Sequence, residues 1–128
     1  MVEEKKNVLF VCTANELRSP TAEELFRKNK DIGVKSAGTS PFANQQIDRN
    51  IIDWSDLIIV MENHHMKKIL EIVPSIEDKI VVLNIPDIYA RNDPKLIQIL
   101  KKKVPTHLNK LIQEKTKKNE RKNRSQSS

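Results

Sequence analysis

Short apolar runs alternate with amphipathic stretches along most of the chain. The β-branched and aromatic residues from Val8 to Cys12 are typical of a buried parallel strand. Similar short runs predict three more strands, at Val34–Ser36, Leu57–Met61 and Ile80–Leu83. Buried strands separated by helical patterns indicate an α/β protein with a parallel sheet.

Between these runs, apolar residues recur at helical spacing. The pattern predicts helices at Pro20–Lys30, within Gln45–Trp54, at His64–Ile72, and at Asp93–Ile112 with an interruption near Pro105. The first of these should end at Asp31-Ile32-Gly33. Right-handed crossovers then predict a three-layer, doubly wound, four-stranded parallel sheet in the order 2-1-3-4, with helices on both faces.

The turn between the first strand and the first helix carries the candidate chemistry. Cys12 is the only cysteine, and after five residues Arg18 precedes Ser19-Pro20, which is typical of a helix start. A turn at a strand end beside a helix N-terminus directs backbone N–H groups inward and fits a phosphoryl group. In this architecture the position is also where ligands bind, because the winding of the sheet reverses there.

We expect this turn to hold Cys12 as a thiolate nucleophile, because helix N-termini and nearby cations favour the anionic form of a thiol. Ser19 could donate a hydrogen bond to the thiolate, and the planar fork of Arg18 could hold two phosphoryl oxygens. The alternative is that Cys12 is a small buried hydrophobic residue. The spacing to Arg18 and the helix start favour the nucleophile.

The phosphate loop is defined here as residues Cys12–Arg18. Its candidate phosphate-binding residues are Thr13, Ala14, Asn15, Glu16, Leu17 and Arg18. Asn15 can hold a left-handed turn through its side-chain amide. Glu16 brings a negative charge into a loop built for anions, so we expect its side chain to point outward.

The run CTANELRSPTAE resembles the active-site loop of the low-molecular-weight protein tyrosine phosphatases, which has Cys, five residues, Arg and Ser with an internal Asn. The likeness is greatest to a short bacterial-type branch, and it extends to Ser36–Thr39, Trp54–His65 and Ile85–Leu96. It implies a phosphocysteine intermediate, no cofactor or metal, and a phosphorylated protein or small aryl phosphate as substrate, with inorganic phosphate as product. It also implies that Ser36 contacts Asn15.

A phosphatase of this kind needs a proton donor for the leaving oxygen. The acid loop, residues Ile85–Asp93, follows the fourth strand and should emerge at the same sheet edge as Cys12. The resembling family has an Asp-Pro acid followed by tyrosine and then Asn-Asp. Aligning Tyr89 and Asn92-Asp93 with these features makes Asp87 the candidate acid, although isoleucine replaces the family's proline.

Two residues of the acid loop keep alternative interpretations. Asp93 precedes Pro94, so it could be the acid or the N-cap of the last helix. Tyr89 could stack on a phosphoaryl group or anchor the loop by partial burial. The sequence leaves the choice for Tyr89 open and favours the cap for Asp93.

The chain of 128 residues is long enough for one modest core. Residues 113–128 hold six Lys or Arg and two Glu, and therefore contribute +4 of the net charge of +6. We predict a phosphatase-like domain at residues 1–112 and a basic, disordered tail at 113–128. A single cysteine, a charged N-terminal segment and no long apolar run predict a soluble cytoplasmic protein. We also expect it to be a monomer that does not bind membranes.

Other functions explain the sequence less well. A non-catalytic module that binds phosphorylated protein would not need Cys12, Arg18 and an acid together. A related arsenate reductase needs further cysteines, and Leu17 also occupies the place of a second, protective cysteine in many family members. Nucleic acid is not expected as a partner, because aromatics make up 4% of the chain and offer little stacking surface. We interpret His64-His65 as surface residues and not as a metal site.

Overall fold

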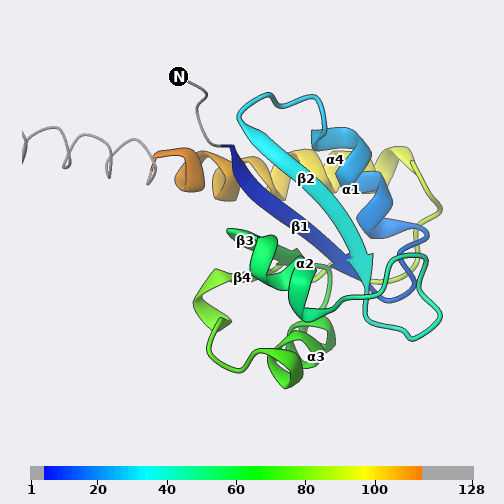
Figure 1. Ribbon diagram of the computed structural model, residues 1–128. Coiled ribbons are helices and arrows are strands. Elements are labelled where there is room, and N and C mark those ends of the chain that lie inside the picture. Colours follow the sequence, from blue (N-terminus) through cyan, green and yellow to red (C-terminus); the bar gives the residue numbers. More distant parts are fainter. Residues whose placement is uncertain (1–4, 114–128) are drawn as a thin grey trace, which may run out of the picture.

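The computed structural model describes residues 5–113, so all but the first residue of the predicted tail lies outside the described part of the chain. Four parallel strands form one sheet (Figure 1), namely β1 (Lys6–Cys12), β2 (Ile32–Gly38), β3 (Leu57–Val60) and β4 (Ile80–Val82). Their order is β2-β1-β3-β4, which confirms the predicted topology.

The helices connect successive strands and follow the last one. They are α1 (Arg18–Phe26), α2 (Arg49–Trp54), α3 (Asn63–Ile72), the 3-10 helix η1 (Glu77–Lys79) and α4 (Pro94–Lys103). Residues 105–113 are also helical, after a bend at Val104. The interruption predicted near Pro105 is therefore confirmed, and its cause is the missing N–H of proline.

The central strand β1 divides two hydrophobic clusters. Val8 and Phe10 face the cluster that contains residues of α1 and α4, whereas Leu9 and Val11 face the cluster that contains residues of α2 and α3. All four side chains are fully buried. The alternation follows from the two-residue period of a strand, and it places helices on both faces of the sheet as predicted.

The first helix differs from the prediction at both ends. It begins at Arg18, with Leu17 as the N-cap, so Ser19 lies inside the helix and does not cap it. It ends at Phe26, because the polar residues that follow have no apolar face to bury. Ile32 was expected to close this helix but instead begins β2, where it pairs with Lys6 of β1.

Two other helix starts follow from side-chain caps. Asp48 accepts a hydrogen bond from the backbone N–H of Ile51 at 2.8 Å and begins α2. Asp93 accepts one from the backbone N–H of Lys95 at 2.9 Å and begins α4, with Pro94 in the first turn. No helix in the described part of the chain is long and apolar enough to cross a membrane.

Candidate active site

The phosphate loop joins the carboxyl end of β1 to the N-terminus of α1 (Figure 1). Cys12 is buried, and its Sγ lies 2.9 Å from Ser19 Oγ. Gly38, at the end of β2, allows the loop to approach closely, since a Cβ there would lie 2.5 Å from the carbonyl oxygen of Thr13 and 2.9 Å from the backbone nitrogen of Asn15. The loop is therefore held against the ends of two strands.

Asn15 is the centre of the hydrogen bonds inside this loop. Its φ of 55° lies in the left-handed region, which asparagine tolerates better than most residues. Its Nδ2 donates to Ser19 Oγ at 3.0 Å and to Ser36 Oγ at 2.9 Å. Its Oδ1 accepts from the backbone N–H of Gln45 at 3.2 Å. One buried side chain thus ties the loop to α1, β2 and the segment before α2.

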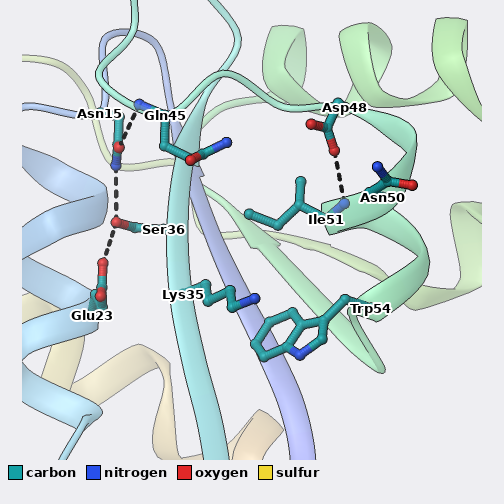
Figure 2. A pocket seen from close by; sticks show the side chains of 9 residues that line it. All are labelled: Asn15, Glu23, Lys35, Ser36, Gln45, Asp48, Asn50, Ile51 and Trp54. Atoms are coloured by element: carbon teal, nitrogen blue, oxygen red, sulfur yellow. Dashed lines mark hydrogen bonds between the residues drawn. The ribbon is translucent and has the colours of Figure 1, made fainter.

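These bonds have a direction that matters for Cys12. Ser36 donates its hydroxyl hydrogen to a Glu23 carboxylate oxygen, so its own oxygen is free to accept from Asn15 (Figure 2). Ser19 Oγ likewise accepts from Asn15, and its hydroxyl hydrogen has two acceptors within reach, Cys12 Sγ at 2.9 Å and the carbonyl oxygen of Ala37 at 3.4 Å.

Arg18 is buried beneath the loop, with 1% of its surface exposed. Its Nη1 donates to the carbonyl oxygen of Ile85 at 2.7 Å and to the carboxylate of Glu62. Its Nε lies 3.6 Å from Asp87 Oδ1. Nε and Nη2 make no hydrogen bond to the described residues, and Nε is within ion-pair distance of Asp87.

Glu62 and His65 form a capping box at the start of α3. The carboxyl group of Glu62 is partly desolvated, which opposes ionisation, but its hydrogen bond and charge interaction with Arg18 outweigh that effect and lower its pKa. A carboxylate at this place fixes the orientation of Arg18 while leaving its other edge open.

The acid loop is anchored at its ends and exposed in its middle. Asp87 has 58% of its side-chain surface exposed and faces Arg18, whereas Tyr89 is half-buried against the core cluster. The backbone N–H of Asn92 donates to Thr21 Oγ1 at 3.0 Å. Asp93 caps α4, so its carboxylate is already engaged there. The structure therefore brings Asp87, and not Asp93, to the phosphate loop's arginine.

The chain is similar to several known proteins. Residues 7–54 match the family model described as Low molecular weight phosphotyrosine protein phosphatase. The chain is 27% identical over 117 residues to the low molecular weight protein-tyrosine-phosphatase Wzb of Escherichia coli strain K12. The match covers 67% of this chain and 80% of Wzb. It is also 28% identical over 100 residues to the protein-arginine-phosphatase of Geobacillus stearothermophilus. That match covers 59% of this chain and 68% of the relative.

A solved structure agrees with these sequence relatives. The tyrosine phosphatase Wzb from Escherichia coli K30, in complex with phosphate, superposes with a TM-score of 0.63 at 24% identity, covering 77% of this chain and 93% of that chain. At this identity the likeness establishes a common fold. The resemblance to the low-molecular-weight protein tyrosine phosphatases is confirmed.

Two loop residues depart from the phosphatase pattern inferred from the sequence. Leu17, in the place of a second cysteine, has 37% of its surface exposed, and Glu16 is exposed as well. The expected outward position of Glu16 therefore fits the structure. Of the remaining loop residues, Thr13 and Ala14 are half-buried, and the carbonyl oxygen of Ala14 accepts from the backbone N–H of Asn44 at 3.3 Å.

The sequence analysis missed Glu62 and misplaced His65. His65 was expected at the surface together with His64, but it is fully buried, whereas His64 is exposed. A signal was available, because an acidic residue followed by a polar residue three positions later, directly after a strand, is the spacing of a capping box. The carboxyl end of β3 also lies at the same sheet edge as Cys12.

Glu62, His64 and His65 place one ligand-type atom each within 4.8 Å of one another, as a metal site would. The chemistry of the set argues against a metal ion. Both ring nitrogens of His65 already make hydrogen bonds, one to the backbone N–H of Glu62 and one to Thr13. The Glu62 carboxylate is bound by Arg18. Glu62 and His65 instead contact Arg18 and Thr13 of the phosphate loop.

A cavity of about 550 Å³ lies behind the phosphate loop, beside the edge strand β2 (Figure 2). It is lined by Asn15, Glu23, Lys35, Ser36, Gln45, Asp48, Asn50, Ile51 and Trp54. On its far side the Nζ of Lys35 lies 4.4 Å from the centre of the Trp54 ring. Glu23, Ser36 and Asn15, which are joined by hydrogen bonds, are thus among the residues that line the cavity.

Proposed function

We propose that the chain is a cysteine-dependent phosphatase that hydrolyses phosphotyrosine or small aryl phosphate esters through a phosphocysteine intermediate. One observation carries the proposal. Cys12 Sγ, which lies 2.9 Å from Ser19 Oγ, and Arg18, whose Nε lies beside Asp87, stand at the two ends of one loop that Asn15 ties to its neighbours. A nucleophile, a phosphate cradle and a cation are therefore combined in seven consecutive residues.

In the first step, the Cys12 thiolate attacks phosphorus and the bond from phosphorus to the leaving oxygen breaks. Arg18 and the loop amides bind the non-bridging oxygens, on which negative charge is carried through the transition state. The carboxyl group of Asp87 gives its proton to the leaving oxygen. The products are the free phenol and a phosphocysteine. Arg18 and the amides supply the positive charge, so no step requires a metal ion.

In the second step, the Asp87 carboxylate takes a proton from water while the water oxygen attacks phosphorus. The sulfur–phosphorus bond breaks, and inorganic phosphate and the thiolate are formed. Asp87 serves both steps because it is ionised at the end of the first. Its exposed position above Arg18 gives both the leaving group and water access to it.

The proposal extends to the setting of the reaction. We propose that residues 1–112 are the catalytic domain and that residues 113–128 are not needed for catalysis. A phosphorylated protein or a small aryl phosphate is the substrate. The single cysteine fits a reducing compartment, and we propose that the protein acts in the cytoplasm as a monomer.

The test compares the full-length protein with its Cys12→Ser variant on a nitrophenyl phosphate ester. We expect turnover by the wild type and none by the variant, which lacks the thiolate. Vanadate should inhibit the wild type and protect Cys12 from iodoacetate. Phosphate binding without turnover would instead indicate a non-catalytic phosphoprotein-binding module. Because one relative is named a protein-arginine-phosphatase, a phosphoarginine peptide is the matched comparison to a phosphotyrosine peptide.

A further inference from the structure

His65 lies beneath the phosphate loop and touches it from a sequence-distant element. Its Nε2 is 2.9 Å from Thr13 Oγ1, and its Nδ1 accepts the backbone N–H of Glu62 at 2.9 Å. No part of the ring is exposed, whereas the neighbouring His64 faces solvent. The imidazole therefore connects the residue after the nucleophile to the first turn of α3.

The hydrogen bond to Glu62 decides which nitrogen of His65 carries the proton. Because Nδ1 accepts a backbone N–H, it is unprotonated, and the hydrogen of the neutral ring is on Nε2. Nε2 therefore donates to Thr13 Oγ1. Burial, followed by the charges of His64 and Arg18, lowers the pKa of His65 to about 4 although Glu62 opposes the shift. The ring stays neutral, in one tautomer, near neutral pH.

This donation has a consequence for Thr13. Its hydroxyl oxygen is occupied by His65, so its hydroxyl hydrogen must point elsewhere. Among the described residues it has no acceptor, since Thr13 Oγ1 makes no hydrogen bond apart from that with His65. The backbone of Thr13 is fixed as well, because its carbonyl oxygen accepts from the N–H of Ser40 at 2.9 Å. The hydroxyl is thus a fixed donor in the phosphate loop.

The other end of the capping box acts on Arg18. The same residue, Glu62, gives its backbone N–H to His65 and receives Nη1 of Arg18 on its carboxylate. The first turn of α3 is therefore tied to Thr13 through His65 and to Arg18 through Glu62. His65 thus contacts Thr13 directly and also binds the backbone of Glu62, whose carboxylate holds Arg18.

We propose that His65 is a positioning residue that aims the Thr13 hydroxyl at a bound phosphoryl oxygen and holds Glu62 where it orients Arg18. The inference rests on the proposed phosphatase function for its catalytic consequence. The hydrogen-bonded geometry that carries it also predicts an effect on phosphate binding alone. His65 touches no reacting atom in this scheme and acts through Thr13 and Glu62.

Two variants of His65 separate its two hydrogen bonds. In His65→Asn the amide oxygen can still cap the Glu62 N–H, but the side chain is too short to reach Thr13. In His65→Gln the amide nitrogen lies near the place of Nε2 and can still donate to Thr13. Thr13→Val removes the hydroxyl at nearly unchanged volume. His107→Asn, at a histidine far from the phosphate loop in a different cavity, is the matched control.

For His65→Asn we expect kcat on phenyl phosphate and vanadate affinity to fall by about 10-fold, the effect of one hydrogen bond. His65→Gln should recover activity to within about threefold of wild type, and His107→Asn should equal wild type. The double variant His65→Asn/Thr13→Val should lose no more activity than the less active of the two single variants, because both substitutions remove the same contact. Thermal unfolding of each variant shows whether the fold is retained.

Several results would overturn the inference. They are additive losses in the double variant, wild-type kcat and vanadate affinity in His65→Asn, or equal losses in His65→Asn and His65→Gln. Should the wild type hydrolyse no phosphate ester, the proposed function fails, and the same variants are then compared by calorimetric titration with inorganic phosphate. Equal phosphate affinity across wild type, His65→Asn and Thr13→Val would then refute the positioning role by itself.

Discussion

The phosphate loop and the acid loop meet at Arg18 but are held in different ways. In the phosphate loop, Asn15, Arg18 and Ser19 are buried, and their polar groups are bonded to one another or to neighbouring elements. In the acid loop, Asp87 and Ile88 are exposed. The phosphate loop is therefore held rigidly by buried hydrogen bonds, whereas the acid loop is exposed in its middle and anchored at its two ends.

The difference matches what each loop would have to do in the proposed reaction. A phosphoryl group is bound through many short hydrogen bonds, and these are effective only when the donors are already in place. A proton donor must reach leaving groups of different size and then exchange with water. We therefore expect changes in the phosphate loop to reduce both stability and activity, and changes at the tip of the acid loop to reduce activity alone.

Among the supporting residues of the two loops, the largest effect should come from Asp87→Asn at the tip of the acid loop. Turnover of phenyl phosphate should fall by roughly 100- to 10,000-fold, because its leaving group needs a proton, while an activated nitrophenyl ester should be affected less. The melting temperature should not change. Steady-state rates on both esters at one pH, with a melting curve for each protein, measure this.

Asp93→Asn is the matched control within the same loop. Asparagine still caps a helix, so stability and the wild-type dependence on the leaving group should be kept. A selective loss on phenyl phosphate in Asp93→Asn, with Asp87→Asn unaffected, would show that the proton comes from the Asp93-Pro94 pair.

In the phosphate loop, we expect Asn15→Ala to cost about 1–3 kcal/mol of folding free energy, because the buried hydroxyls of Ser19 and Ser36, and the backbone N–H of Gln45, lose a hydrogen bond. Activity should fall in the same variant. Asn15→Gly removes the same side chain but accepts a positive φ without strain, so it should be more stable than the alanine variant. Urea unfolding measures both, and an unchanged midpoint in Asn15→Ala would contradict a rigid cradle.

The smallest effect concerns His65, which lies beneath the phosphate loop. The pKa of His65 is about 4 in the folded protein, below its ordinary value of 6.5, so the unfolded chain binds the proton more readily. Stability should therefore fall as the pH decreases from about 6.5 towards 4. His65→Gln should flatten the slope of melting temperature against pH in this window. A slope equal to that of the wild type would show that His65 does not contribute.

Much of the fold could be predicted because its signals are local. The apolar run of β1 and the helical period of α3 and α4 each reflect a pattern within a few turns of chain, and the right-handed crossover rule then fixes the strand order. The end of α1 was placed incorrectly, since the pairing of Ile32 with Lys6 depends on a strand elsewhere in the sequence.

The candidate site shows the same division between local and long-range signals. The sequence by itself determined the phosphate loop, because Cys12, Asn15, Arg18 and Ser19 are close neighbours in one turn. Only the tertiary structure decided that Glu62 holds Arg18 and that His65 is buried against Thr13, whereas the cap role of Asp93 was already favoured by the sequence and is confirmed. Local spacing specifies backbone shape, but the partner of a buried polar group is set by whichever distant segment the packed sheet brings within hydrogen-bonding distance.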